Sequence, residues 1–589
     1  MSNLEISKLL KNIATAYTIK NEKKYRFQII AYQKASESIA NLNGEVSDYF
    51  KEGSLELLPG IGPSIRSHLE ELFEKGEVKR FNWVLKGIPK SVFVLTDIPT
   101  FGPKKAFRLV MEFKLENENT AINDLSTIAK QGKISHLEGF GEKSEKDILL
   151  SIEEFKAGKG KTTRMILPYA FETAEKVKNY LQKESAVKQV EALGSLRRRV
   201  STVGDIDFAV ATDNPSKVIE HFINYPFKER VIEKGEVSAS ILISGGKQID
   251  LLVQPVEAFG SLLQHFTGSK NHNVHLREYA LSKGLSLSEY GIKNTKTKNK
   301  VLKKYSSEKD FYEALGMKWI PPELREDNGE IELSIGSKLP KIVELSDIKG
   351  DFHIHSSFPI EPSHDSGLNS MEEMLKKATL LGYEYLGFSE HNPSLNNHTS
   401  SQIYEILKKR DKKIEQLKSN KKNVRIFKLL EVDILPNGDL ALDDKSLELL
   451  DAAIVSIHSI FNMNRDEMTR RVLKGLSSKK AKILAHPTGR LLNNRNGYDL
   501  DFEIIFNYCK ENNKALEINS WPQRLDLPDT LVKRAVEKGI KLVINSDSHA
   551  ANQMELLKYG VFVARRGWAT PNDILNTMTY NNVANWFNS

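Results

Sequence analysis

The sequence predicts a multidomain protein with an α-helical N-terminal region, an α+β middle region and a C-terminal α/β barrel. The chain has 589 residues, which is more than one hydrophobic core can organise. Apolar residues recur at helical spacing through residues 1–50. Towards the C-terminus, short apolar runs that end in a histidine or a carboxylate alternate with helical patterns. That alternation predicts a β/α barrel whose functional residues lie at the C-terminal ends of its strands.

The composition indicates a globular protein without a membrane segment. No run of about 18 apolar residues occurs, and the first residues lack the basic-then-apolar pattern of a secretory signal, so we expect a cytoplasmic location. The single cysteine, Cys509, excludes an internal disulfide and a cysteine-based metal cluster. Any metal site must therefore use His, Asp and Glu. The formal net charge of +8 is compatible with a nucleic-acid partner but does not establish one.

Three glycine-containing turns punctuate the helical N-terminal region, at residues 58–63, 98–105 and 137–143. In each, the last glycine falls at or near the start of the next helical pattern. Free backbone N–H groups and the helix dipole attract phosphate at such a position. One turn would be a weak signal, but three similar turns resemble helix-hairpin-helix elements, which hold the DNA backbone without reading bases. The candidate DNA-binding glycines are Gly60, Gly62, Gly102, Gly139 and Gly141.

A pair of carboxylates marks the middle region. Asp205 and Asp207 are two residues apart in a predicted strand, so their side chains share one face. Taken alone, Asp-x-Asp is more often a solvated or capping pair. A third carboxylate, Asp250, lies inside another apolar run, where an unpaired charge would be costly. Three carboxylates on neighbouring strands predict a two-cation site for phosphate chemistry, with Mg²⁺ as the preferred hard cation.

Two further motifs flank these carboxylates. Residues 194–198, Gly-Ser-Leu-Arg-Arg, form a turn before them, and residues 266–269, Phe-Thr-Gly-Ser, offer an aromatic surface and hydrogen-bond donors for a nucleotide. In this order and behind the glycine turns, the motifs resemble family X DNA polymerases over about residues 1–330. Residues 319–326 resemble the closing segment of that family.

The resemblance implies a role for each matching residue. Asp205, Asp207 and Asp250 would be catalytic and hold two Mg²⁺ ions, with Asp250 assisting the primer 3′-hydroxyl. The incoming deoxynucleoside triphosphate would contact Gly194, Ser195, Arg198, Phe266, Gly268, Asn273 and Arg164. Tyr32 matches the family as well and would help to bind a 5′-phosphate on the DNA.

Three positions depart from the family pattern. His265 stands where Tyr is usual, which leaves the discrimination between deoxyribose and ribose open, and Leu252 replaces an Arg. His68 stands at the position of the lyase lysine of the eukaryotic repair polymerases. Since a Schiff base needs an amine nucleophile, we expect no 5′-deoxyribose-phosphate lyase there.

The C-terminal region carries a second set of ligand-type residues. His353 and His355 are two apart on one predicted strand, a geometry that suits a metal. A lone histidine on an apolar face is more often a core residue, but six at strand ends favour a metal cluster. The pattern resembles the PHP (polymerase and histidinol phosphatase) domain over about residues 350–575. The resemblance implies a three-metal cluster of Zn²⁺, Mn²⁺ or Fe²⁺ held by His353, His355, Asp365, His391, Glu431, His458, His486, Asp547 and His549.

Within this set, Glu431 would bridge two metals and take part in hydrolysis at phosphorus. Asp365 is separated from the His353–His355 pair by an apparent insertion, and Glu361 is an alternative ligand. Because the ligand set is essentially complete, we expect an active hydrolase.

The predicted organisation follows from these motifs. We expect helical DNA-binding domains at 1–85 and 86–160, a nucleotidyltransferase palm at 161–260, a thumb at 261–330, a linker at 331–349 and a PHP domain at 350–589. The leading hypothesis is a monomeric polymerase that fills short DNA gaps in base excision repair. Its PHP domain would act as a 3′–5′ exonuclease, process 3′-ends or cleave at abasic sites. Two alternatives remain: a DNA-targeted nuclease with an inactive polymerase half, and a small-molecule phosphatase.

Overall fold

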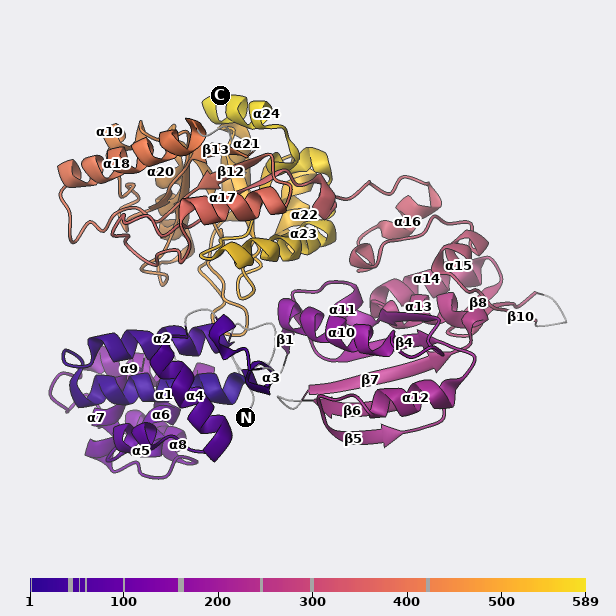
Figure 1. Cartoon of the computed structure of the whole chain (residues 1–589), viewed down its shortest axis with the longest axis horizontal. Coiled ribbons are helices and arrows are strands. Elements are labelled where there is room, and N and C mark those ends of the chain that lie inside the picture. The colour runs from indigo at the N-terminus through magenta and orange to yellow at the C-terminus, as the bar shows by residue number, and fades with distance from the viewer. Residues whose placement is uncertain are drawn as a thin grey trace. The chain divides into compact units, whose positions relative to one another are not determined.

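A computed structural model (Figure 1) describes the chain except residues 2, 41–45, 52, 59–60, 99–100, 157–163, 244–246, 297–300 and 420–423. Gly60, one of the predicted DNA-binding glycines, lies outside the described residues. The chain divides into two compact units. Unit 1 holds residues 1–163, 223–233 and 240–249, and unit 2 holds residues 164–222, 234–239 and 250–589. Every helix in the described part is too short or too polar to cross a membrane.

The N-terminal part of unit 1 is helical, as predicted. Its helices are α1 (Asn3–Asn21), α2 (Arg26–Ala40), α3 (Val46–Lys51), α4 (Pro63–Lys75), α5 (Lys79–Leu85), α6 (Lys90–Thr96), α7 (Pro103–Phe113), α8 (Ala121–Lys130) and α9 (Glu142–Lys156). Two hydrophobic clusters organise them. One includes Leu10, Tyr17 and Leu69, and the other includes Leu109 and Ile148.

Glycines stand where two of these helices begin. Gly62 is the N-cap of α4 and Gly102 is the N-cap of α7, and each is followed by a proline at the first helical position. Gly139 has φ +80°, which only glycine adopts without strain, and Gly141 directly precedes α9. The predicted placement of glycines at helix starts is confirmed for the turns that the structure describes.

A five-stranded sheet follows, with strand order β2-β4-β7-β6-β5. Its strands are β2 (Gln189–Ala192), β4 (Ile206–Ala211), β5 (Lys228–Lys234), β6 (Ser238–Ile243) and β7 (Lys247–Gln254). Strand β2 pairs antiparallel with β4, in a register that sets Ala192 opposite Phe208. Helices α10 (Leu167–Leu181), α11 (Gly194–Arg197) and α12 (Pro215–Ile223) accompany the sheet, and β1 (Met165–Ile166) pairs with β3 (Thr202–Val203).

The next segment folds around its own core of Leu276, Phe311, Tyr312 and Ile331. Its elements are α13 (Phe259–Thr267), α14 (Lys270–Ser282), β8 (Leu285–Ser288), β9 (Gly291–Asn294), β10 (Leu302–Lys303), α15 (Glu308–Ala314), η3 (Pro322–Leu324) and α16 (Glu330–Ile335). Helix α16 extends into the predicted linker 331–349. Because Ile331 is buried in this core, residues 330–335 belong to it rather than to a polar connection.

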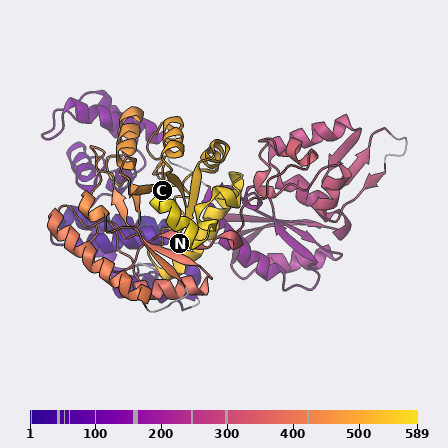
Figure 2. The same ribbon diagram turned by 90° about the horizontal axis from the view of Figure 1, so that it is seen from above.

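The C-terminal region alternates strands and helices, as predicted. Its strands are β11 (Gly350–Ile354), β12 (Tyr385–Phe388), β13 (Arg425–Lys428), β14 (Glu431–Asp433), β15 (Ala453–Ser456), β16 (Ala481–Leu484), β17 (Ala515–Asn519) and β18 (Lys541–Asn545). Its helices are α17 (Met371–Leu380), α18 (Ser400–Ser419), α19 (Asp444–Leu447), α20 (Arg465–Leu476), α21 (Phe502–Glu511), α22 (Asp529–Lys538), α23 (Leu557–Arg566) and α24 (Tyr580–Asn588). Figure 2 shows orange helices of this region on the outer side of its strands.

All strand pairs in this region are parallel. They form sheets of order β11-β12-β13 and β14-β15-β16-β17-β18. Parallel bridges join Ile354 to Ser548 and His391 to Glu431, so both edges of one sheet meet the other. The strands are almost wholly buried, which suits parallel strands covered by helices. A closed barrel remains a prediction, and this strand order is the one it requires.

Candidate functional site

The three predicted carboxylates of the middle region come from two strands and the turn before one of them. Asp207 is in β4 and Asp250 is in β7, whereas Asp205 lies one residue before β4 rather than inside it. Burial raises the pKa of Asp207 to about 7, and repulsion from Asp205 and Asp250 adds to the rise. Carboxylates that repel one another in this way favour a cation, and an all-oxygen set suits Mg²⁺. The residues therefore fit the predicted cation site.

The turn that precedes β4 is tied to the strand. Leu193 N donates to Asp207 O over 2.8 Å, and Gly194 follows with φ +57°. A Cβ at Gly194 would lie 3.5 Å from Asp207 Oδ2, so the turn passes close to the carboxylates. Ser195 is the second residue of α11, and its carbonyl accepts from Val200 N over 3.1 Å. Arg164 lies close to the residue before Asp205, because its Nη1 would be 3.3 Å from a Cβ at Gly204.

The two arginines of the turn have different partners. Arg198 donates from Nε to Glu326 Oε1 over 2.9 Å and from Nη1 to Thr267 O over 2.5 Å. Arg197 makes a two-pronged contact with the Glu308 carboxylate, at 2.9 and 2.7 Å. Arg325 also donates to Glu308, over 2.7 Å.

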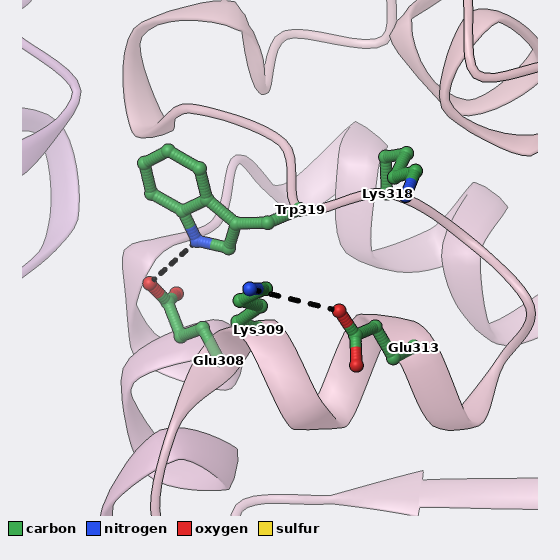
Figure 3. A pocket seen from close by; sticks show the side chains of 5 residues that line it. All are labelled: Glu308, Lys309, Glu313, Lys318 and Trp319. Atoms are coloured by element: carbon green, nitrogen blue, oxygen red, sulfur yellow. Dashed lines mark hydrogen bonds and ion pairs between the residues drawn. The ribbon is translucent and has the colours of Figure 1, made fainter.

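Glu308 is thus a buried anion between two guanidinium groups. Although burial opposes its charge, Arg325 and Arg197 lower the pKa of Glu308 to about 2. Figure 3 shows Trp319 over the same carboxylate, and its Nε1 donates to Glu308 Oε2 over 3.3 Å. Lys309 and Glu313 line the same surface pocket. The Arg197–Glu308 contact joins residues 111 positions apart, and the sequence motifs did not predict it.

Of the predicted nucleotide-contacting residues of the 266–273 segment, Gly268 lies beside Arg198. A Cβ at Gly268 would meet Arg198 Nη1 at 3.0 Å, and Gly268 has φ +70°. Phe266 is 39% exposed, which leaves ring surface for stacking. The Asn273 side chain is held locally, donating to His265 O over 2.7 Å and accepting from Gln264 Nε2 over 2.9 Å.

In unit 1, Tyr32 is almost fully covered. It is 4% exposed, and its hydroxyl lies 2.8 Å from His68 Nδ1. The two rings are stacked with their centroids 6.3 Å apart. Tyr32 therefore exposes little of its side chain to a ligand.

The C-terminal ligand residues converge on one carboxylate. Glu431, at the start of β14, is 1% exposed. Five histidine nitrogens approach its oxygens: His391 Nδ1 at 2.9 Å, His486 Nε2 at 3.0 Å, His353 Nε2 at 3.2 Å, His458 Nε2 at 3.4 Å and His355 Nε2 at 3.6 Å. Asp547 Oδ1 lies 3.2 Å from His355 Nε2 and 3.5 Å from His353 Nε2, and the His549 ring stacks on His355 at 4.0 Å.

Three residues of this cluster, Glu431, His355 and His458, have protonation states that suit metal binding. Burial raises the pKa of Glu431, but the nearby His391, His353 and His458 together lower it by more. The pKa of Glu431 therefore lies well below its usual range. Burial lowers the pKa of His458 to about 4 and that of His355 well below its usual range. Glu431 is therefore anionic and these two imidazoles are neutral at pH 7, which are the forms that bind metal.

Buried nitrogens without hydrogen bonds test whether this cluster fits metal ions. Within the predicted ligand set, five such atoms are found: His353 Nε2, His355 Nδ1, His391 Nδ1, His486 Nδ1 and His549 Nε2. His353 Nε2 and His391 Nδ1 lie close to the Glu431 carboxylate, but their angles do not make these contacts hydrogen bonds. Four groups have ligand atoms within 4.8 Å of one another: His355–His391–His549, His353–His355–Glu431, His391–Glu431–His458 and His364–Asp433–His458. This nitrogen-rich donor set fits divalent transition metals.

The insertion after the His353–His355 pair departs from expectation. Glu361 Oε2 lies 3.1 Å from His398 Nε2, and Asp365 is exposed and belongs to none of the four groups among the described residues. Its charge does raise the pKa of His549, against the larger lowering by burial. His364, between them in sequence, lies 3.1 Å from Asp433 Oδ1.

Sequence reasoning missed three residues of this region. They are His364, Asp433 and Glu517. Asp433 is two positions after Glu431, so strand periodicity could have found it. Glu517 is a charge inside the apolar run of β17, a signal of the same kind as Asp250.

The fold and the two centres define a class of protein: a nucleotidyltransferase behind helix-hairpin-helix elements, joined to a histidine-rich metal centre. Residues 1–78 match the model of a helix-hairpin-helix domain, and residues 262–326 match that of the DNA polymerase beta thumb. The chain is 33% identical over 585 residues to the DNA polymerase/3′-5′ exonuclease PolX of Bacillus subtilis (strain 168), covering 99% of both chains. This chain belongs to the family X DNA polymerases.

Two further relatives each match part of the chain. DNA polymerase lambda of Rattus norvegicus is 23% identical over 352 residues, 55% of this chain and 56% of its own. A probable phosphatase of Thermoanaerobacter sp. (strain X514) is 24% identical over 237 residues, 38% of this chain and 89% of its own.

Proposed function

We propose that this chain is a DNA-directed DNA polymerase that fills short gaps during DNA repair and also carries a PHP-type phosphoesterase activity. The observation that carries the polymerase part is the group of three carboxylates around Asp207, whose charges repel one another beside the Gly194 turn. The likeness to the DNA polymerase/3′-5′ exonuclease of Bacillus subtilis supports both activities. The proposed partners are gapped or primer–template DNA and deoxynucleoside triphosphates, and the proposed state is a cytoplasmic monomer.

In the polymerase site, Asp205, Asp207 and Asp250 hold two Mg²⁺ ions. These ions neutralise phosphate charge and orient the reacting groups when bound. Asp250 assists removal of the primer 3′-hydroxyl proton. Arg198 and Ser195 bind the outer phosphates of the nucleotide, with the Gly194 backbone beside them and Arg164 across from them. Phe266 and Gly268 flank the sugar and base, and Asn273 contacts the base edge.

In unit 1, the helix starts at Gly62, Gly102 and Gly141 bind the DNA backbone. Their backbone N–H groups face a phosphate without contacting bases, which suits a protein that acts on any sequence. Tyr32 contributes through its hydroxyl at a 5′-phosphate.

In the C-terminal centre, the nine residues predicted from sequence would hold a cluster of Zn²⁺ or Mn²⁺, with Glu431 as a shared ligand. The metals supply Lewis acidity and an activated water when bound. The buried histidine nitrogens without hydrogen bonds support this assignment. Among the hydrolytic reactions that share this chemistry, 3′–5′ exonuclease activity is favoured by the name of the Bacillus relative.

A primer-extension assay tests the polymerase proposal. Purified protein is given a gapped duplex, deoxynucleoside triphosphates and Mg²⁺ or Mn²⁺, beside an Asp207→Asn variant. The wild type should extend the primer and the variant should lose at least 100-fold in rate, because one ligand and its charge are gone. If the wild type adds no nucleotide, the polymerase half serves only to target a nuclease to DNA.

A second candidate for the C-terminal centre is a small-molecule phosphatase, favoured by the likeness to a probable phosphatase. Competition between a labelled DNA 3′-end and a sugar phosphate separates the two. Release of nucleotides from DNA in the presence of excess sugar phosphate supports the nuclease. Hydrolysis confined to the sugar phosphate supports the phosphatase.

A further inference from the structure

A buried carboxylate behind the histidine cluster has no assigned role. Glu517, in β17, is 0% exposed. Its Oε1 accepts from His353 Nδ1 over 2.7 Å and from Asn545 Nδ2 over 2.9 Å. Its Oε2 accepts from His486 N over 2.7 Å and from Asn519 Nδ2 over 3.1 Å. Four donors on two oxygens fully satisfy this carboxylate.

These hydrogen bonds orient two of the proposed metal ligands. Because Glu517 accepts from His353 Nδ1, that nitrogen carries its proton, and Nε2 is the nitrogen directed at Glu431 and Asp547. The same carboxylate holds the His486 backbone, whose ring Nε2 lies 3.0 Å from Glu431 Oε1. One side chain thus fixes His353 from β11 and His486 after β16.

Glu517 is not itself placed as a ligand. It belongs to none of the four groups of ligand atoms found among the described residues, and its oxygens are already occupied by donors. A group that contacts ligands from behind acts through their orientation.

We propose that Glu517 is the positioning residue of the C-terminal metal centre, holding the His353 ring in the tautomer and orientation that direct Nε2 to the cation. This inference rests on the proposed function of that centre. It predicts a loss of metal affinity on substitution while the polymerase centre keeps its activity, because Glu517 touches none of the polymerase residues.

The test uses the full-length chain and Co²⁺ as the probe ion. Glu517→Gln keeps the shape but loses the charge and one acceptor oxygen, so two of the four donors, either His353 Nδ1 with Asn545 or His486 N with Asn519, are left unpaired. We expect Co²⁺ affinity, measured by competition with a chromophoric chelator, to fall about 10- to 100-fold. The visible absorption of bound Co²⁺ should change as well, because a histidine is displaced, and primer extension should stay within about twofold.

Asp526→Asn is the matched control. Asp526 is also 0% exposed, and its oxygens accept from Thr488 N rather than from an imidazole. Its substitution should lower the melting temperature but leave the Co²⁺ affinity within about twofold. Equal losses of affinity in both variants would mean that general packing is the cause and would overturn the proposal.

A double-mutant cycle with His353 tests whether Glu517 affects Co²⁺ affinity through this histidine. In a His353→Ala background, Glu517→Gln should cause little further loss of Co²⁺ affinity, because its route of action is gone. Additive losses, or an unchanged affinity and spectrum in the single variant, would overturn the proposal. If Glu517→Gln does not fold, Glu517→Asp, which keeps the charge but shortens the reach to Nδ1, should show the same loss. A wild-type protein that binds no Co²⁺ would instead refute the proposed metal centre.

Discussion

Arg198 Nε donates to Glu326 Oε1 over 2.9 Å, so the arginine proposed to bind nucleotide phosphates is already paired with a carboxylate. The Arg198 side chain is 14% exposed and that of Glu326 is 25% exposed. A triphosphate that engages Arg198 must compete with Glu326 for the guanidinium. Breaking this ion pair therefore reduces the free energy gained when the nucleotide binds.

Replacing Glu326 by Gln should lower the KM for the nucleotide. A partly exposed ion pair contributes up to about 1 kcal/mol, so we expect a decrease of about threefold, with kcat changed less than twofold. Glu323→Gln is the control, since Glu323 pairs with Arg565 and not with Arg198. Steady-state kinetics on a gapped duplex give both constants. An increased KM in the Glu326 variant would show that the pair orients Arg198 instead of competing for it.

Because of Glu308, the free energy of unfolding of unit 2 should decrease at acidic pH. Its folded pKa of about 2 lies below the ordinary 4.5, so its contribution is present above pH 4.5 and is lost as the pH falls towards 2. The shift corresponds to about 3 kcal/mol. Urea midpoints between pH 6 and 3 should fall more steeply for wild type than for Glu308→Gln.

At pH 7 the same variant should be strongly destabilised, because Arg325 is 0% exposed and would lose its ionic partner. Glu313→Gln, in the neighbouring surface pocket of Figure 3, should change stability by less than about 0.5 kcal/mol. Parallel pH curves for wild type and Glu308→Gln would contradict the assigned role of this carboxylate.

Gly367 controls how closely the insertion passes the histidine cluster. A Cβ there would lie 2.0 Å from His355 O, and the next residue, Leu368, donates to His549 O over 2.6 Å. Gly367→Ala should therefore displace two ligand-bearing segments, reducing bound metal and nuclease rate at least tenfold while primer extension is retained. In Gly336→Ala the nearest atom would be 3.5 Å away, and neither activity should change.

The metal content of single alanine variants shows how much each ligand-type residue of the insertion, His364, Asp365 or Glu361, contributes to metal binding. His364 shares a ligand group with Asp433 and His458, whereas Glu361 pairs with His398. Elemental analysis after chelation and reloading should show the largest loss of metal for His364→Ala, a smaller loss for Asp365→Ala and none for Glu361→Ala. If Glu361→Ala instead loses the most metal, Glu361 is the metal ligand of the insertion.

The sequence predicted what depends on local spacing. Helical periodicity located α1 and α2, and apolar runs ending in ligand residues located most of the C-terminal strands together with His458. Those runs did not identify β17, and Glu431, expected after a strand, is the first residue of β14. The motifs around Asp207 and Gly194 likewise identified segments that lie close together.

What the sequence could not predict depends on contacts between distant positions. Glu308 meets Arg197 across 111 residues, and Glu517 meets His353 across 164. The predicted linker 331–349 includes most of α16, because the polar composition of the segment hides the apolar side chains of Ile331 and Leu333, which pack into the core. In the insertion, Glu361, His364 and Asp365 are close together in sequence. Their spacing alone does not predict which of them faces the histidine cluster around Glu431.

The central claim is that one chain carries two separate metal centres with opposite effects on a DNA 3′-end. The most direct test follows a 5′-labelled primer in a gapped duplex, with and without nucleotides, for wild type, Asp205→Ala and His353→Ala. We predict that Asp205→Ala shortens but does not extend the primer, that His353→Ala extends but does not shorten it, and that wild type does both. Loss of both reactions in either variant, or shortening that survives in His353→Ala, would contradict the claim.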